Sequence, residues 1–370
     1  MPSACWTLSQ KPERNIKSVI AHSTAVEGLR VPGDERNVSP QLVMRKKNST
    51  LFLLNDLLVQ HEIVPGLNCV VQTVLSRLGI DNDHVQAFVY ASPYFQAECH
   101  VIDTDHCVIR LSSTLVEALD DTELMFVVGH ELGHFLLGHL LDSGPVAEEN
   151  LEELMLSRRR ELSVDRVGLV SCRSLDSALS AMMKTMSGLS SKHLKINVSS
   201  LVSQLRSLDT EAGALHAAMS THPSFIIRCR SLLWFSMNGM FQRDTSVLER
   251  SQLDNINNII VADLEKFIDK RVIESINEIE SEFEFWFMAS AVVRSGSFSR
   301  AAQGIFVNRF GNESTEKLKT LLTSLSTTDA VVESTKRLEA SQHRFEIIAP
   351  RKFARTEREI SSRAQEILFA

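Results

Sequence analysis

Two histidines and a glutamate stand at a spacing that suits a metal site: His130, Glu131 and His134. In an α-helix, residues four positions apart lie on the same face, so the imidazoles of His130 and His134 can share one ion. Glu131 then projects beside that ion, where its carboxylate can take a proton from an activated water molecule. This spacing is typical of zinc sites with a general base. We therefore predict one Zn²⁺ per chain at this position.

A zinc ion that activates water needs three protein ligands, so a third ligand must come from another residue. The extended motif with a third histidine on the same helix is absent, because Leu137 and Leu140 stand where it has glycine and histidine. His139 follows His134 by five residues and lies on a different part of the helical wheel. We expect His139 at the surface or beside a ligand, and not as a ligand itself.

Glu161 and Asp165 offer a better completion of the site, because they also lie one helical turn apart. We predict that Glu161 is the third zinc ligand. Asp165 would accept a hydrogen bond from a ligand imidazole, which orients the ring and raises its basicity. The alternative interpretation is an ordinary exposed pair of acidic residues, which would repel each other mildly.

The elements that must position these residues can be predicted from local signals. Asp120 or Asp121 can cap a helix, with Glu123 as the capping-box partner, and Gly144-Pro145 is its predicted end. A second helix is expected from the acidic stretch at 148–153 to about Leu179. Its mixed charges, including Arg158–Arg160, indicate a solvated face.

The remaining patterns predict a small sheet and further helices. Short runs rich in apolar and β-branched residues predict strands, and apolar residues at helical spacing predict helices. Strands are expected at 85–90, 97–102 and 107–111; two helices over 51–78, divided at Pro65-Gly66; a loop at 187–203; a helix after Pro223; and helices over 253–279, 283–293, 299–310 and 316–325.

Composition limits the class of protein. The chain has 370 residues, 44% of them hydrophobic and 23% charged, enough for sizeable cores. Its formal net charge of -7 argues against nucleic acid as a partner. Neither a signal peptide nor an apolar stretch of membrane-spanning length is evident, and the six scattered cysteines form no disulfide framework. We therefore expect a cytoplasmic protein that does not span a membrane.

Three regions follow from these patterns. Residues 1–50 are predicted to be an irregular lead-in, 51–243 a metal-dependent domain, and 244–370 a helical C-terminal domain. The expected fold class is α+β and mostly α, with a small sheet beside the helix that carries His130. Since 244–370 lacks a cluster of histidine or cysteine, we expect it to bind a protein partner or to regulate the site.

An ordered set of motifs over about 70–235 resembles the HtpX-like and CAAX-prenyl-protease-like zinc metallopeptidases, which are gluzincins. The set comprises VQAFVY at 85–90, Asp121-Thr122-Glu123-Leu124 leading into HELGHFLLGH, Glu161 with Asp165, Thr221-His222-Pro223, and Arg228. Two departures stand out. Gln86 replaces an asparagine of the family, and the transmembrane helices of many members are missing, so the resemblance is to a soluble member.

The resemblance implies that His130, His134 and Glu161 bind zinc and that Glu131 is the catalytic base. It also implies that His222 and Arg228 lie near the metal, with His222 facing the oxyanion or covering the open position and Arg228 bracing the acidic helix. The fold it implies is zincin-like. From the residues alone, His222 is equally a neighbour of a helix start and Arg228 a surface cation.

The resulting functional prediction is a zinc-dependent metalloendopeptidase acting on protein or peptide substrates. The substrate would lie along an edge strand, for which 107–111 is the candidate. One alternative is a catalytically latent zinc-binding module that acts in partner binding or chaperone-like regulation through 244–370. Another is a zinc hydrolase for substrates other than peptides.

Overall fold

The structure is a computed structural model that describes residues 52–103, 105–139, 150–204, 223–237 and 250–369. Two compact units are present. Unit 1 comprises Met1–Gly144, Ser157–Gly213 and Ser220–Phe267, and unit 2 comprises Pro145–Leu156, Ala214–Met219 and Ile268–Ala370. The predicted lead-in at 1–50 and the predicted boundary at 243–244 lie outside the described residues.

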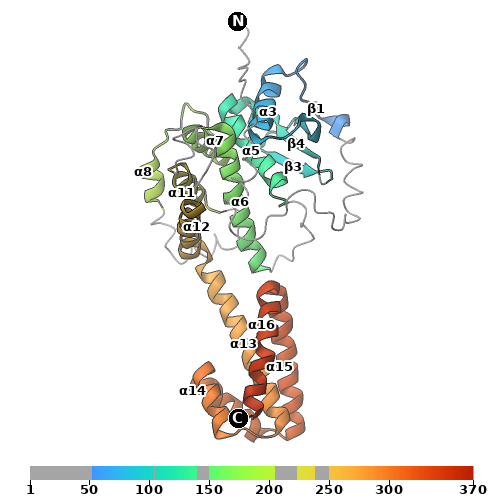
Figure 1. The fold of residues 1–370 in the computed structure, drawn as a ribbon, viewed down its shortest axis with the longest axis vertical. Helices are drawn as coiled ribbons and strands as arrows, with labels where there is room; N and C mark the ends of the chain where they lie inside the picture. The colour runs from blue at the N-terminus through green and yellow to red at the C-terminus, as the bar shows by residue number, and fades with distance from the viewer. Residues whose placement is uncertain (1–51, 104, 140–149, 205–222, 238–249, 370) are drawn as a thin grey trace. The chain divides into compact units, whose positions relative to one another are not determined.

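The described chain is mostly helical, with one four-stranded sheet in unit 1, which confirms the predicted α+β class (Figure 1). The strands are β1 (Leu57–Leu58), β2 (Val85–Tyr90), β3 (Ala97–Val101) and β4 (Cys107–Ser112). Their order is β1-β2-β4-β3, in which β2 and β4 are parallel and the outer pairs are antiparallel. The three predicted strands are therefore confirmed.

The prediction that 107–111 forms an edge strand is wrong. β4 is bonded on both sides, since its Ile109 lies opposite Ala87 of β2 and Cys99 of β3. Because β3 pairs antiparallel with the outer side of β4, one edge strand of the sheet is β1 and the other is β3. The other side of β3 has no strand partner among the described residues.

The core of unit 1 is formed by the sheet, two helices that follow its strands or precede them, and buried residues of later helices. Val85 and Ala87 of β2, with the odd-numbered residues of β4, point to one face and are buried. Helices α3 (Pro65–Leu78) and α5 (Asp121–Leu136) pack their apolar sides into the same core. The predicted helix before Pro65 is present at 52–55 in the described part of the chain, but β1 follows it, so the predicted extent is wrong.

Helix α5 begins as predicted and ends early. Asp120 accepts hydrogen bonds from the backbone N–H groups of Thr122 and Glu123, and Glu123 accepts one from the N–H of Asp120, so the capping box is present. The helix ends at Leu136, before the predicted end at Gly144, because the chain turns at Gly138 with φ of 69°.

The second predicted helix is divided in two. α6 (Leu151–Cys172) ends where Arg173 adopts φ of 57°, and α7 (Leu175–Ser187) starts with Ser174 as its cap. The predicted solvated face is also wrong at Arg158, which is fully buried. Lys184 of α7 forms a buried ion pair of 2.6 Å with Glu123, which joins α7 to the start of α5.

The remaining elements of unit 1 complete the domain around α5 and α6. They are η1 (Asn82–His84), α4 (Ser113–Ala118), α8 (Val198–Ser203), α11 (Phe225–Ser236), α12 (Arg250–Leu264) and the π-helical segment η2 (Glu265–Asp269), whose last two residues belong to unit 2. Helix α11 follows Pro223 as predicted, and α8 occupies part of the predicted loop at 187–203.

Unit 2 is helical. It contains α13 (Lys270–Ser295), α14 (Arg300–Ser324), α15 (Thr327–Ile348) and α16 (Pro350–Phe369). Figure 1 shows α13, α15 and α16 side by side, and Phe283, Phe345 and Phe353 form their common core. The predicted break between 279 and 283 is absent, because α13 is continuous there.

The first turn of α6 belongs to unit 2. The carboxylate of Glu152 accepts hydrogen bonds from the backbone N–H groups of Arg351 (2.8 Å) and Lys352 (3.1 Å), which start α16. Glu152 thereby caps a helix that lies about two hundred positions away in the chain. No described helix has the length and apolar character needed to cross a membrane.

Candidate metal centre

Glycines let α5 and α6 approach closely. A Cβ atom on Gly133 of α5 would lie 3.0 Å from Cβ of Val164, and one on Gly168 of α6 would lie 2.7 Å from the backbone oxygen of Phe126. A Cβ on Gly129 would overlap Ser171. Since larger residues would push the helices apart, this crossing sets the distance from the histidines on α5 to the acids on α6.

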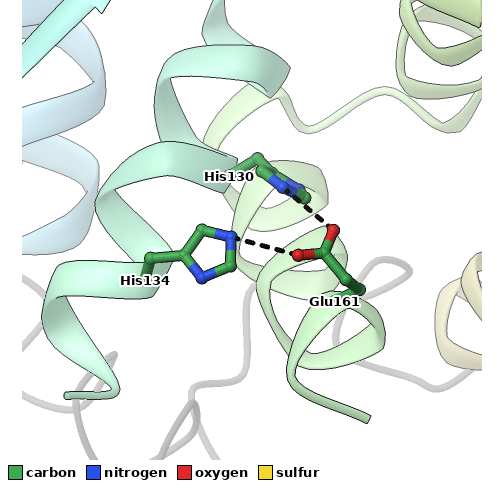
Figure 2. Close-up of side chains that lie close together, drawn as sticks. All are labelled: His130, His134 and Glu161. Atoms are coloured by element: carbon green, nitrogen blue, oxygen red, sulfur yellow. Dashed lines mark ion pairs between the residues drawn. The ribbon is translucent and has the colours of Figure 1, made fainter. Parts of the chain in front are cut away.

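The crossing brings His130, His134 and Glu161 together (Figure 2). Nε2 of His130 lies 3.6 Å from Oε2 of Glu161, and Nε2 of His134 lies 3.5 Å from Oε1. One donor atom from each residue falls within 4.8 Å of the others. The three residues predicted as metal ligands therefore share one small volume, and all three side chains are largely buried.

These distances suit a shared zinc ion better than direct hydrogen bonds. Separations of 3.5 and 3.6 Å are long for a nitrogen–oxygen hydrogen bond. Nitrogen and oxygen ligands of zinc lie about 2.0–2.2 Å from the ion, so two corners of its tetrahedron are about 3.4 Å apart. The donor set of two imidazoles and one carboxylate, with the fourth corner left for water, also fits a catalytic zinc site.

Asp165 contacts the other face of His130. Its Oδ1 lies 3.0 Å from Nδ1 of His130. An ionised carboxylate only accepts hydrogen bonds, so Nδ1 carries the proton and the lone pair of Nε2 points towards the metal position. Asp165 thus has the contact that was predicted for it.

Arg228 of α11 reaches the site through Asp165. Its Nε and Nη2 atoms donate hydrogen bonds of 2.8 and 2.6 Å to Asp165, and Nη2 lies 4.0 Å from Glu161. Burial opposes ionisation of Asp165, but Arg228 and His130 outweigh it and hold the pKa of this carboxyl well below its usual range. Asp165 therefore stays ionised between the guanidinium group of Arg228 and the imidazole N–H of His130.

Burial shifts the ionisation of Glu131 towards its neutral form. Burial raises the pKa of Glu131 to about 7; His130 opposes this shift and Glu161 adds to it. A carboxyl group whose pKa lies near neutrality can both take up and release a proton at physiological pH. For His130, burial opposes protonation, but Asp165 and Glu161 outweigh it and raise its pKa.

The edge strand β3 packs against α5 beside Glu131. The pKa of the Cys99 thiol on β3 is raised by its hydrogen bond with Cys107, by burial and by the charge of Glu131. Sequence reasoning missed this strand as the edge beside the site. It also missed the close approach of the helices, although Gly129 and Gly133, four residues apart within a helical pattern, are a usable signal.

Two other predicted residues have different outcomes. His139 is not among the three grouped donors, but its Nδ1 lies 3.4 Å from Nδ1 of His134, on the ring side away from Glu161. Burial lowers the pKa of His139 to about 3, so the ring is neutral. His222 lies outside the described residues, as does Leu140.

Comparison with known proteins gives a partial match. Residues 65–148 match Peptidase family M48, a segment that includes His130, Glu131 and His134 and ends before Glu161. A curated relative, plastoglobule-localized metallopeptidase 48, chloroplastic, from Arabidopsis thaliana, is 26% identical over 171 residues, covering 39% of this chain and 50% of the relative. The chain thus spans about half the length of the relative it matches. No solved structure matches it.

Proposed function

We propose that the protein is a zinc-dependent metalloendopeptidase, a proposal supported by the match of residues 65–148 to Peptidase family M48. The family match confirms the resemblance to zinc metallopeptidases that the motifs predict. The observation that carries the proposal is the convergence of His130 and His134 from α5 with Glu161 from α6 at distances that suit one ion.

In this proposal, His130, His134 and Glu161 hold the ion. Zinc bound by such a set supplies Lewis-acid chemistry, since it acidifies water and polarises a carbonyl group. Asp165 keeps the proton of His130 on Nδ1, so that Nε2 remains a ligand. Arg228 fixes Asp165 with two hydrogen bonds and acts as a positioning residue.

Glu131 is the proposed general base and acid. Its carboxylate takes the proton of the attacking water and delivers it to the nitrogen of the leaving amine. The pKa of about 7 caused by burial supports both transfers near neutral pH. The role of His222 beside the oxyanion rests on the resemblance alone.

The substrate backbone is proposed to lie along the outer edge of β3. Unpaired N–H and C=O groups of an edge strand can bond to an extended peptide, which binds with weak demands on its side chains. β3 packs against α5, the helix that carries Glu131, which supports this position.

The test is a comparison of metal content and casein hydrolysis in the full chain. We expect Glu131→Gln to keep zinc and to lose about 10²–10⁴-fold in turnover, because only the proton transfer is removed. His134→Ala should lose both zinc and activity. Glu117→Gln, an exposed glutamate on α4, is the matched control and should behave as wild type.

If Glu131→Gln hydrolysed casein as fast as wild type, the proposed role of Glu131 as general base would be refuted. If the wild-type chain binds stoichiometric zinc and cuts neither casein nor unfolded proteins, the result favours the alternative hypothesis of a catalytically latent zinc-binding module. If wild type binds no zinc, the metal site itself is wrong.

A further inference from the structure

A large groove lies within unit 2, on the helices that carry none of the proposed catalytic residues. It has a volume of about 1050 Å³ and is lined by α13, by the part of α14 after Gly311, and by the first half of α15. Gly311, with φ of 81°, breaks the helical path of α14, so residues 312–324 form a separate wall. The volume is just above the range of about 300–1,000 Å³ of small-molecule pockets.

The floor of the groove is apolar. Phe285 and Trp286 of α13 form it together with leucines of α14. Among the unit 2 side chains whose burial is described, two large apolar ones are exposed, Leu325 (38%) and Val332 (62%), and both line this groove. The two exposed apolar side chains thus lie at one groove with an apolar floor, which favours an interaction site over scattered exposure.

The rim of the groove carries an excess of negative charge. Its acidic side chains are Glu313, Glu316, Asp329 and Glu333, and its basic ones are Lys317 and Arg337. With four acids against two bases, the lining has a formal excess of two negative charges.

Both rim cations are already engaged. Lys317 pairs with Glu313 at 2.8 Å, and Arg337 pairs with Glu333 at 2.5 Å while its guanidinium lies 4.8 Å from the centre of the Trp286 ring.

Glu316 is also paired, with Lys319 outside the lining at 2.7 Å, so among the described residues Asp329 is the rim acid that accepts a hydrogen bond, from Ser326, without forming an ion pair. The rim thus keeps a smaller excess of negative charge, which favours an arriving cation over an anion.

From these features we infer that the groove binds a protein segment that presents apolar side chains flanked by lysine or arginine. The apolar floor takes the hydrophobic side chains, and the acidic rim selects basic flanks by charge complementarity. Nucleic acid and anionic membrane surfaces are disfavoured, because their phosphates would face the acidic rim. The inference goes beyond the proposed hydrolysis and does not depend on a metal.

The probe is a fluorescently labelled peptide of leucine and lysine patterned as an amphipathic helix. Its binding to the full chain is measured by anisotropy in the Glu131→Gln background, so that cleavage cannot consume the probe. We expect Val332→Lys to weaken binding about tenfold or more, because it places a charge in the apolar contact. Met237→Lys, the same change at a site of 68% exposure in unit 1, should have no effect.

A second pair of variants tests the charge. Glu313→Gln with Glu316→Gln should weaken the peptide several-fold at low salt, and the difference should shrink as salt screens the charges. The matched control, Glu274→Gln with Glu339→Gln, removes two exposed acids outside the groove and should leave binding unchanged.

Several results would overturn the inference. If a peptide with glutamate in place of lysine bound as tightly as the lysine peptide, charge complementarity would be refuted. If Val332→Lys bound the lysine peptide as tightly as the protein without this change, the groove would not be the binding site. Binding of phosphatidylserine vesicles that Val332→Lys abolishes would assign the groove to a membrane. A dimer in solution that the same variant dissociates would assign it to a second copy of the chain. None of these outcomes depends on whether the protein hydrolyses peptides.

Discussion

Replacing Asp165 by asparagine separates its two proposed tasks, charge neutralisation and orientation of His130. The side chain is fully buried and accepts three hydrogen bonds, two from Arg228 at 2.8 and 2.6 Å and one from His130 at 3.0 Å. Asparagine has the same shape but no charge, and its amide group must point N–H donors at another donor. In the variant, the guanidinium group of Arg228 therefore faces an amide N–H group that repels it.

The expected magnitude follows from burial. Removing one partner of a buried ion pair costs about 3–5 kcal/mol. The side chain of Arg228 is 20% exposed, so water can solvate part of the released charge, and we expect the lower end, about 3 kcal/mol in the free energy of unfolding. Loss of the hydrogen bond that orients a ligand imidazole typically costs 10–100-fold in metal affinity.

Two assays measure these effects separately. Urea denaturation in the presence of a chelator reports the stability of the metal-free protein, and competition with a chromogenic chelator reports zinc affinity. Asp263→Asn is the matched control: Asp263 accepts two hydrogen bonds from Arg230, at 2.5 and 3.3 Å, and contacts none of the proposed ligands. It should lose about 1 kcal/mol of stability and keep its zinc affinity.

Equal zinc affinity in Asp165→Asn and Asp263→Asn would refute the reasoning, because Asp165 would then have no influence on His130. Equal loss of stability in the two variants would show that burial of the Asp165 pair does not set its contribution. Weaker zinc binding in Asp165→Asn alone, with the larger loss of stability, is the expected pattern.

Two further substitutions test the helix contacts. Gly168→Ala places a Cβ 2.7 Å from the backbone oxygen of Phe126, so we expect a loss of about 1–3 kcal/mol and weaker zinc binding; Gly304→Ala, with no atom within 4 Å, should be neutral or slightly stabilising. Glu152→Ala removes the cap of α16 and should cost unit 2 about 1 kcal/mol, whereas Glu339→Ala, at an exposed position, should not. Thermal unfolding measures both pairs.

A Gly168→Ala protein as stable as wild type would show that the crossing of α5 and α6 tolerates a wider separation. Identical melting of Glu152→Ala and Glu339→Ala would show that water replaces the cap of α16 without loss.

The features that could be predicted from sequence are those whose partners lie within one or two turns of chain. The capping box between Asp120 and Glu123 spans three residues, and its hydrogen bonds form within the first turn of α5. The four-residue spacing of His130 and His134 places both rings on one face for the same reason. Short runs rich in apolar and β-branched residues likewise located β2 and β4, although burial does not alternate along either strand.

Features that depend on distant residues were predicted incorrectly or were missed. Strand order is decided by which hydrogen-bonding edges meet, so 107–111 could pass for an edge strand although β4 lies between β2 and β3. Arg158 carries the charge of a surface residue, yet the packing around α6 buries it completely. The break at Arg173 requires a positive φ, which no local signal at a non-glycine residue announces.

The candidate metal centre depends on both local spacing and tertiary packing. Sequence alone identified the residue types and the two pairs that a single helical turn holds together, His130 with His134 and Glu161 with Asp165. That the two pairs face each other was decided by the crossing of α5 and α6, where helix contacts are close enough only because Gly133 and Gly168 have no side chain. Distances between separate helices depend on packing across the whole core, which local spacing does not encode.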